Sequence, residues 1–144
     1  MPDGGSDIPV VRSARRLYTL SPQVTPRGLF YAKHTVAELL RRPDVALGRA
    51  ADAVALLMHT GSLRILDGLC GEFGVEAGAA QAASSYRILR ECGNTLGCSV
   101  PLMLADPIRR PAGEALILAF GLSFSCGAFT MTIPQGGWNP AGVA

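Results

Sequence analysis

The chain has 144 residues, of which 49% are hydrophobic and only 6% aromatic, so it fits one domain with an aliphatic core. A formal net charge of +2 is too small to indicate nucleic acid as a partner. The four cysteines lack CxxC spacing and only two histidines accompany them, which argues against a metal site and a disulfide framework. We therefore expect free thiols, a cytoplasmic protein and no cofactor.

The first part of the chain predicts little regular structure before a helix. Residues 1–28 read as an N-terminal segment that is partly disordered, with an edge strand over Val10–Leu20 and a proline-rich loop over 21–28. A short strand is expected at Leu29–Tyr31. A helix is expected over His34–Arg42, because apolar residues recur there at helical spacing and a proline follows.

The middle of the chain predicts a buried strand followed by a helix. Ala53–Met58 is an uninterrupted apolar run, which is typical of a strand buried on both faces. Ser62 is the expected N-cap of the next helix and Gly74 its expected end. The inner side of that helix is expected to carry Leu63, Leu66, Leu69, Cys70 and Phe73.

A second strand-turn-helix unit is expected downstream, with a strand over Ser85–Leu89 and a helix over Thr95–Ala105. The two units place His59 and Asn94 at strand ends, where open α/β sheets carry their chemistry. The alternation of strands and helices predicts an α/β fold with a mixed or parallel sheet.

The uncharged stretch from Ala115 to Ile133 is nearly as long as a membrane-spanning helix. Gly and Ser residues divide it, and its Phe and Thr residues favour strands. We therefore predict two buried strands, Ala115–Phe120 and Gly127–Ile133, and no membrane segment. Residues 134–144 are expected to be a flexible tail.

Three motifs stand in order along the chain: HTGSLRILDG from His59, LRECGNTLGCSVPLML from Leu89, and ALILAFGLSFSCGA from Ala115. Together they resemble the C-terminal half of a thiolase-fold condensing enzyme. The β-ketoacyl-acyl-carrier-protein synthase III group, with H-x-x-N-x-R-I, G-N-T-x-x-x-S-V-P and A-F-G-x-G-x-x-x-G-A, is most similar. The type III polyketide synthases, with H-x-G-G and L-x-E-Y-G-N, are a close second. The resemblance implies a mixed five-stranded sheet packed with helices, in a domain spanning residues 29–133.

The resemblance also implies a decarboxylative Claisen condensation of acyl and malonyl thioesters, as in fatty acid or polyketide biosynthesis. His59 and Asn94 match the family's catalytic histidine and asparagine. In that reaction two hydrogen-bond donors stabilise the enolate oxygen that forms when CO₂ leaves. Arg64 matches an arginine that helps to dock the acidic acyl carrier protein. The implied partners are acyl carrier protein or CoA thioesters.

The sequence also departs from the family. The N-terminal half is absent, and none of the four cysteines stands in the motif of its nucleophile. Cys98 lies in the first turn of the expected helix, but we expect a packed small side chain there. Ser62 replaces an asparagine. Ser123 replaces a glycine whose backbone N–H helps to form the oxyanion hole, so it is a candidate for that role.

Two hypotheses follow. In the first, the chain is an acyltransferase subunit and another polypeptide supplies the cysteine half; a homo-oligomer is the other assembly expected. In the second, it is a non-catalytic remnant or an interaction subunit that pairs with a full-length condensing enzyme. Either hypothesis predicts an apolar helix face and a sheet edge that need a partner. Acyl-chain specificity, the CoA or carrier-protein donor and the choice between the two family branches stay open.

Overall fold

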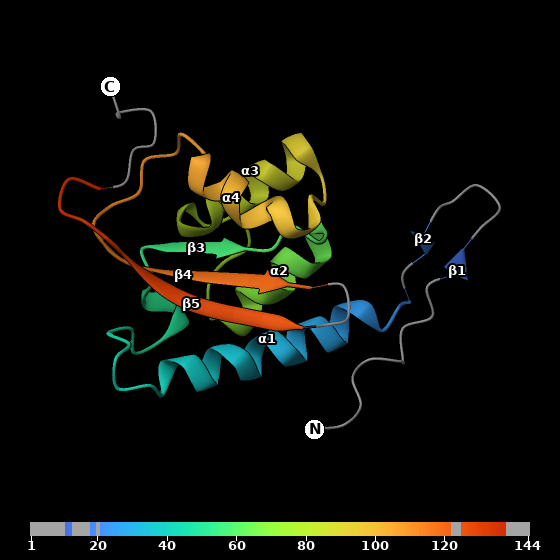
Figure 1. The fold of residues 1–144 in the computed structure, drawn as a ribbon, viewed down its shortest axis with the longest axis horizontal. Helices are drawn as coiled ribbons and strands as arrows, with labels where there is room; N and C mark the ends of the chain where they lie inside the picture. The colour runs from blue at the N-terminus through green and yellow to red at the C-terminus, as the bar shows by residue number, and fades with distance from the viewer. Residues whose placement is uncertain (1–10, 13–17, 20, 122–124, 138–144) are drawn as a thin grey trace.

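A computed structural model describes residues 11–12, 18–19, 21–121 and 125–137 of the chain (Figure 1). The main sheet has three strands in the order β3 (Ala55–Met58), β4 (Gly113–Phe120) and β5 (Cys126–Ile133). β3 and β4 are parallel, whereas β4 and β5 are antiparallel. A separate antiparallel pair joins β1 (Val11–Arg12) to β2 (Tyr18–Thr19).

Four α-helices enclose the main sheet. They are α1 (Val24–Leu40), α2 (Leu63–Glu72), α3 (Ala83–Cys92) and α4 (Ser99–Ala105), with short 3₁₀ turns at η1 (Ala50–Asp52), η2 (Ala80–Ala82) and η3 (Leu96–Cys98). α1 and α2 lie on one face of the sheet, and α3 and α4 lie on the other (Figure 1). Because helices cover both faces of the sheet, β3 and the Ala115–Leu118 segment of β4 consist of apolar residues alone.

Successive residues of β3 and β4 enter different cores, as the alternation of a strand requires. Leu56 and Met58 belong to the core formed with α1 and α2. Leu57 and Ile117 belong to the core formed with α3 and α4. Every residue of β3 is buried, so the predicted strand with two buried faces is confirmed.

Helix α2 follows its sequence signals at both ends. The Ser62 hydroxyl accepts a hydrogen bond from the Ile65 N–H at 3.2 Å, which confirms the expected N-cap. Gly74 takes a φ of +72° just past the helix end. The N–H groups of Gly74 and Val75 bond back to the Gly71 and Cys70 carbonyls, which is the Schellman arrangement. Leu63 is the exception, because it is 58% exposed instead of facing the core.

The predicted loop over 21–28 and strand at Leu29–Tyr31 are wrong, since both regions contribute to α1. Pro26 lies in the first turn of the helix, where a missing N–H costs nothing. The buried residues of α1 recur every three or four positions, at Gly28, Ala32, Val36 and Leu39. This spacing places them on one face of the helix.

The predicted strand at Ser85–Leu89 is also wrong, because these residues form part of α3. Side chains of α3 and η2 bond the outer edge of β3 and the segment just before it, where another strand would pair. The Ser85 hydroxyl accepts from the Met58 N–H at 2.9 Å and donates to the Leu56 carbonyl at 3.1 Å. The Gln81 amide donates to the Ala53 carbonyl at 3.0 Å. The main sheet therefore has three strands in the described part of the chain, not five.

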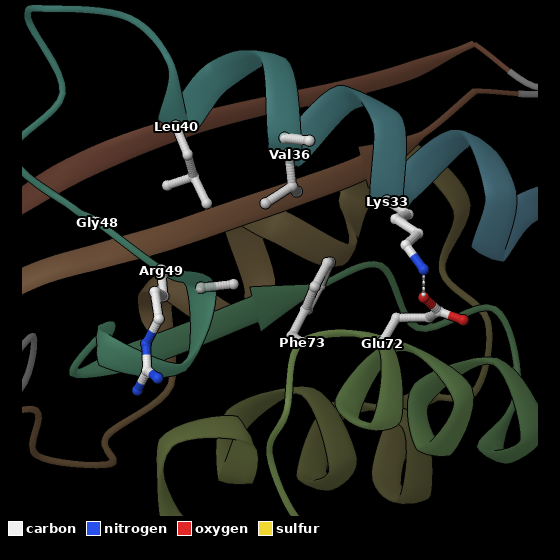
Figure 2. A pocket seen from close by; sticks show the side chains of 9 residues that line it. Lys33, Val36, Leu40, Gly48, Arg49, Glu72 and Phe73 are labelled. Carbon is white, nitrogen blue, oxygen red and sulfur yellow. Dashed lines mark ion pairs between the residues drawn. The ribbon is translucent and has the colours of Figure 1, made fainter.

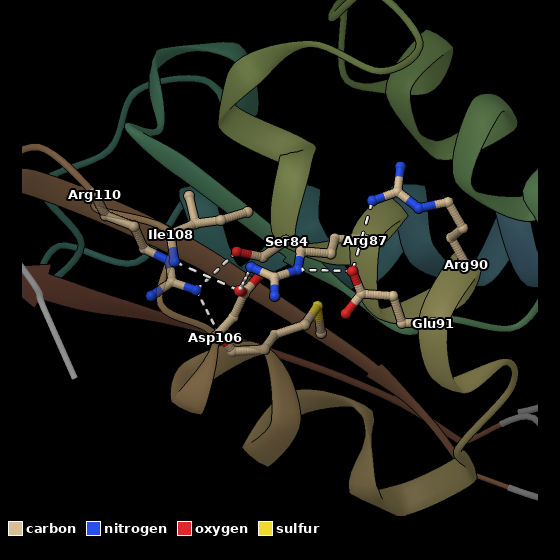
Figure 3. Close-up of polar contacts among 8 residues, drawn as sticks. Ser84, Arg87, Arg90, Glu91, Asp106, Ile108 and Arg110 are labelled. Carbon is tan, nitrogen blue, oxygen red and sulfur yellow. Dashed lines mark hydrogen bonds and ion pairs between the residues drawn. The ribbon is translucent and has the colours of Figure 1, made fainter. Parts of the chain in front are cut away.

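Buried charged groups tie α3 to the end of α4 (Figure 3). Asp106, whose side chain is fully buried, accepts from Arg87 Nη1 at 2.8 Å. The buried Arg110 donates to the Ser84 hydroxyl at 2.8 Å and to the Met103 carbonyl. Burial lowers the pKa of Arg110, and the nearby Asp106 charge opposes that effect.

The uncharged C-terminal stretch forms β4 and β5, as predicted, but the burial predicted for both strands is found only in β4, since Ile133 is the one residue of β5 that is buried. Within the described ranges, no helix combines the length and apolarity needed to cross a membrane. The expected disorder at the chain start and most of the expected tail fall on residues outside the described ranges.

Candidate functional site

His59 is the first residue after β3, as predicted, and its backbone N–H still bonds to the Leu118 carbonyl of β4 at 2.9 Å. The ring packs edge-on against Phe120, with the ring centroids 5.7 Å apart. The residue is only 7% exposed. Burial lowers the pKa of His59, because the charged imidazolium loses more hydration than the neutral ring. The site therefore holds a neutral imidazole at neutral pH.

Gly61 keeps the surroundings of that imidazole open. A Cβ atom at this position would lie 3.5 Å from Cδ2 of His59 and 3.9 Å from Nε2. It would also lie 3.0 Å from Cδ1 of Ile65, which is closer than nearly all real contacts of this kind. A side chain at this position would therefore contact the Cδ2–Nε2 edge of the ring and would require Ile65 to move.

Asn94 does not follow a strand, which corrects the prediction. It lies in the loop between α3 and η3, directly after Gly93, whose φ is +73°. Its side chain is exposed, and its Oδ1 accepts a hydrogen bond from the Leu96 N–H at 3.0 Å. That bond uses the acceptor end of the amide and leaves the Nδ2 hydrogens to donate elsewhere.

The helix expected from Thr95 is in two parts, the turn η3 and the helix α4. Leu96, at the start of η3, has a φ of +51°, a conformation that is strained for a branched side chain. The Asn94 side chain bonds to the N–H of this residue. The strained turn is thus what separates the Asn94 loop from α4.

Hydrogen bonds of the Thr60 side chain join the loop of His59 to the loop of Asn94 and to α4. The Thr60 hydroxyl donates to the Gly93 carbonyl at 3.3 Å and lies 2.9 Å from the Ser99 hydroxyl. Sequence reasoning overlooked Thr60 and Ser99. Their positions in the sequence could have pointed to them, because Thr60 directly follows His59 and Ser99 is the serine of the G-N-T-x-x-x-S motif.

The other predicted residues are placed as follows. Arg64 is exposed in the first turn of α2. Ser123 lies outside the described residues. Cys98 is exposed, which corrects the expectation of a packed side chain. The buried residue at this point is Ser99, which begins α4. Among the described residues, no group of His, Cys, Asp and Glu side chains is arranged to hold a metal ion.

A pocket of about 270 Å³ lies between α1, η1 and the end of α2 (Figure 2). Val36, Leu40 and Phe73 form its apolar wall, and a 2.9 Å ion pair between Lys33 and Glu72 crosses its rim. α2 begins near His59 and runs for about 15 Å, at 1.5 Å per residue, before it reaches this pocket. The pocket is therefore separate from the His59 loop.

The family described as the C-terminal part of 3-oxoacyl-[acyl-carrier-protein] synthase III matches residues 46–133. The chain belongs to this family. Among curated relatives, β-ketoacyl-[acyl-carrier-protein] synthase III of Nitratidesulfovibrio vulgaris is 31% identical over 133 residues. That match covers 87% of this chain but 38% of the relative, so the chain spans about two fifths of the length of that synthase III.

Solved structures show the same fold. The 3-oxoacyl-(acyl carrier protein) synthase III of Pseudomonas aeruginosa matches with a TM-score of 0.66 and 22% identity, over 88% of this chain and 39% of that enzyme. The 1,3,6,8-tetrahydroxynaphthalene synthase of Streptomyces coelicolor, a type III polyketide synthase, matches with a TM-score of 0.67 and 18% identity. That match covers 94% of this chain and 38% of the polyketide synthase. The predicted C-terminal half of a thiolase-like fold is confirmed.

Proposed function

We propose that this chain supplies the His59 and Asn94 half of the active site of a condensing acyltransferase. In this proposal the enzyme removes CO₂ from a malonyl thioester and joins the product to an acyl group. The observation that carries the proposal is the buried, neutral imidazole of His59 at the end of β3, in a loop that is bonded to the Asn94 loop. Membership of the synthase III family supports the same reaction class.

Decarboxylation places a negative charge on the thioester oxygen as the carbon–carboxylate bond breaks. A neutral imidazole N–H and the Asn94 amide would stabilise that oxygen by hydrogen bonding, without transferring a proton. The burial of His59 favours the neutral ring, and the bond from the Leu96 N–H leaves the Asn94 Nδ2 hydrogens available. Each such donor typically contributes about 10²–10³ in rate.

The acyl group would be carried as a thioester on a cysteine of a second polypeptide. The enolate carbon attacks the acyl carbonyl, a carbon–carbon bond forms, the acyl–sulfur bond breaks, and the cysteine leaves as a thiolate. Ser123 is proposed to donate its backbone N–H to the oxyanion in this step. The exposed cation of Arg64 in the first turn of α2 is suited to an acidic carrier protein that delivers the malonyl or acyl thioester.

The test is to purify the tagged chain from its native host, identify stoichiometric partners by mass spectrometry, and measure CO₂ release from malonyl-CoA and malonyl-carrier protein. We expect His59→Ala and Asn94→Ala each to lower the rate of the complex by about 10²–10³. His34→Ala is the matched control, because His34 is the other histidine and lies exposed on α1. A complex whose rate does not change with His59→Ala would favour the alternative, a non-catalytic interaction subunit.

A further inference from the structure

Three buried or half-buried hydroxyl groups connect the His59 loop to the Asn94 loop. Thr60 is fully buried and Ser99 is 1% exposed, and their hydroxyl oxygens lie 2.9 Å apart. The Thr95 hydroxyl also lies 2.9 Å from that of Ser99. Ser99 in turn donates to the Leu96 carbonyl at 2.9 Å.

One arrangement of protons satisfies the central serine completely. A hydroxyl has one hydrogen to donate and two lone pairs that accept. If Ser99 donates to the Leu96 carbonyl, its two lone pairs accept from Thr95 and from Thr60, and the single hydrogen of Thr60 is then shared between Ser99 at 2.9 Å and the Gly93 carbonyl at 3.3 Å. A buried polar network is stable only when its members are satisfied in this way.

The order of the residues links this network to the proposed site. Thr60 directly follows His59, and Thr95 directly follows Asn94. Neighbouring Cα atoms are about 3.8 Å apart, so each threonine restrains the site residue beside it. We propose that Thr60, Ser99 and Thr95 form a hydroxyl clamp that fixes the position of His59 relative to Asn94. This inference rests on the proposed function, and it assigns these three as positioning residues for that reaction.

The clamp also holds the strained turn beside Asn94. Leu96, with its φ of +51°, is bonded at both ends of its backbone: its N–H by Asn94 Oδ1 and its carbonyl by the Ser99 hydroxyl. A strained conformation persists only where its surroundings determine it. In the proposed reaction, the His59 ring and the Asn94 amide must both donate to the same enolate oxygen. A displacement of either donor by about 1 Å can therefore lower the rate by about 10².

Thr60→Val tests the clamp, since valine keeps the shape of threonine and removes the hydroxyl. In the complex with its partner and with malonyl-CoA as substrate, we expect kcat to fall by about tenfold to a hundredfold while KM stays within about twofold. Thr60→Ser, which keeps the hydroxyl, should restore kcat to within about threefold of the wild type. Thr132→Val is the matched control, because the Thr132 hydroxyl bonds to Glu114 at an exposed position. An unchanged kcat in Thr60→Val would overturn the inference.

A double-mutant cycle separates positioning from a general loss of structure. If Thr60 acts by aligning His59 with Asn94, Thr60→Val should cost much less in an Asn94→Ala background than in the wild type. Fully additive losses would contradict the clamp. Failure of the proposed function itself is recognised differently, by a rate that does not respond to His59→Ala.

The clamp can also be tested without activity by ¹H–¹³C NMR of the imidazole groups. The chain has two histidines, so the His59 and His34 signals are assigned with one substitution. Thr60→Val should shift or broaden the His59 signal, Thr60→Ser should restore it, and the signal of the exposed His34 should stay fixed as a reference. A His59 signal that is identical in all three proteins would overturn the clamp.

Discussion

At the scale of single residues, burial determines which charge state His59 carries. The imidazole lies against Phe120 and is almost closed off from solvent, and desolvation is the cause that lowers its pKa. The position of His59 could be predicted from the sequence, because an apolar run ending in a polar residue marks the end of a buried strand. The charge state of His59 could not be predicted from the sequence, because it depends on burial against the Phe120 ring of β4, which is remote along the chain.

This burial predicts a pH dependence of stability. The ordinary pKa of His59 is 6.5 and its folded value is lower, so the unfolded state binds a proton first as the pH falls. The neutral His59 therefore makes its full contribution to the free energy of unfolding above about pH 6.5. This contribution is lost progressively as the pH falls from there to the folded pKa of His59. We expect Tm to fall from about pH 7 to about pH 5, and this loss to be smaller in His59→Asn.

The measurement is a series of thermal melts at fixed ionic strength, which gives Tm across that pH range. His34→Asn serves as the control and should keep the wild-type slope, because His34 is exposed on α1. Equal slopes for His59→Asn and the wild type would show that His59 does not carry the effect.

At the scale of elements, α3 shows where sequence patterns were insufficient. Tyr86 and Ile88 alternate with polar residues, which favoured a strand. The segment is a helix because Ser84, Ser85 and Ile88 bury one helical face, and because Ser85 bonds the edge of β3. The bonds of Ser85 reach residues 27 and 29 positions away, which no local pattern encodes. By contrast, Ser62 and Gly74 act within α2 itself, and the sequence predicted both.

The edge contact of Ser85 predicts a loss of stability in Ser85→Ala. The substitution leaves the buried Met58 N–H and Leu56 carbonyl without this partner. An unsatisfied buried polar group costs about 1–3 kcal/mol, so we expect the free energy of unfolding to fall by about that amount. Urea denaturation followed by circular dichroism gives the value.

Ser125→Ala is the control for that experiment. Ser125 is exposed in the loop before β5, so its substitution should change the free energy of unfolding by less than about 0.5 kcal/mol. If the two variants unfolded at the same urea concentration, the edge contact would not contribute to stability.

At the scale of the whole molecule, the described surface carries large apolar groups that a complete core would cover. Leu63 and Leu96 are 58% and 52% exposed, beside the two loops of the proposed site. Phe129 of β5 is 49% exposed. It pairs in register with Ile117, whose side chain enters the core under α3 and α4. Phe129 therefore lies on the face of the sheet that carries α3 and α4.

The family was predictable at this scale because three short motifs kept their order and spacing. The number of strands was not predictable from the sequence, because the outer edge of β3 is bonded by the Ser85 side chain from α3. Under the proposed function, the half-exposed apolar side chains of the described surface are where the second polypeptide would pack.

We therefore predict that Phe129→Asp weakens the complex between this chain and its proposed partner. Placing a carboxylate in an apolar interface leaves it without a partner, which typically costs more than about 2 kcal/mol for a central contact. The dissociation constant should rise by more than about tenfold, as measured by sedimentation velocity or titration calorimetry with the purified partner. Phe30→Asp is the matched control, because Phe30 is 57% exposed on α1, which covers the other face of the sheet. An equal effect of the two substitutions, or none from Phe129→Asp, would place the partner elsewhere on the molecule.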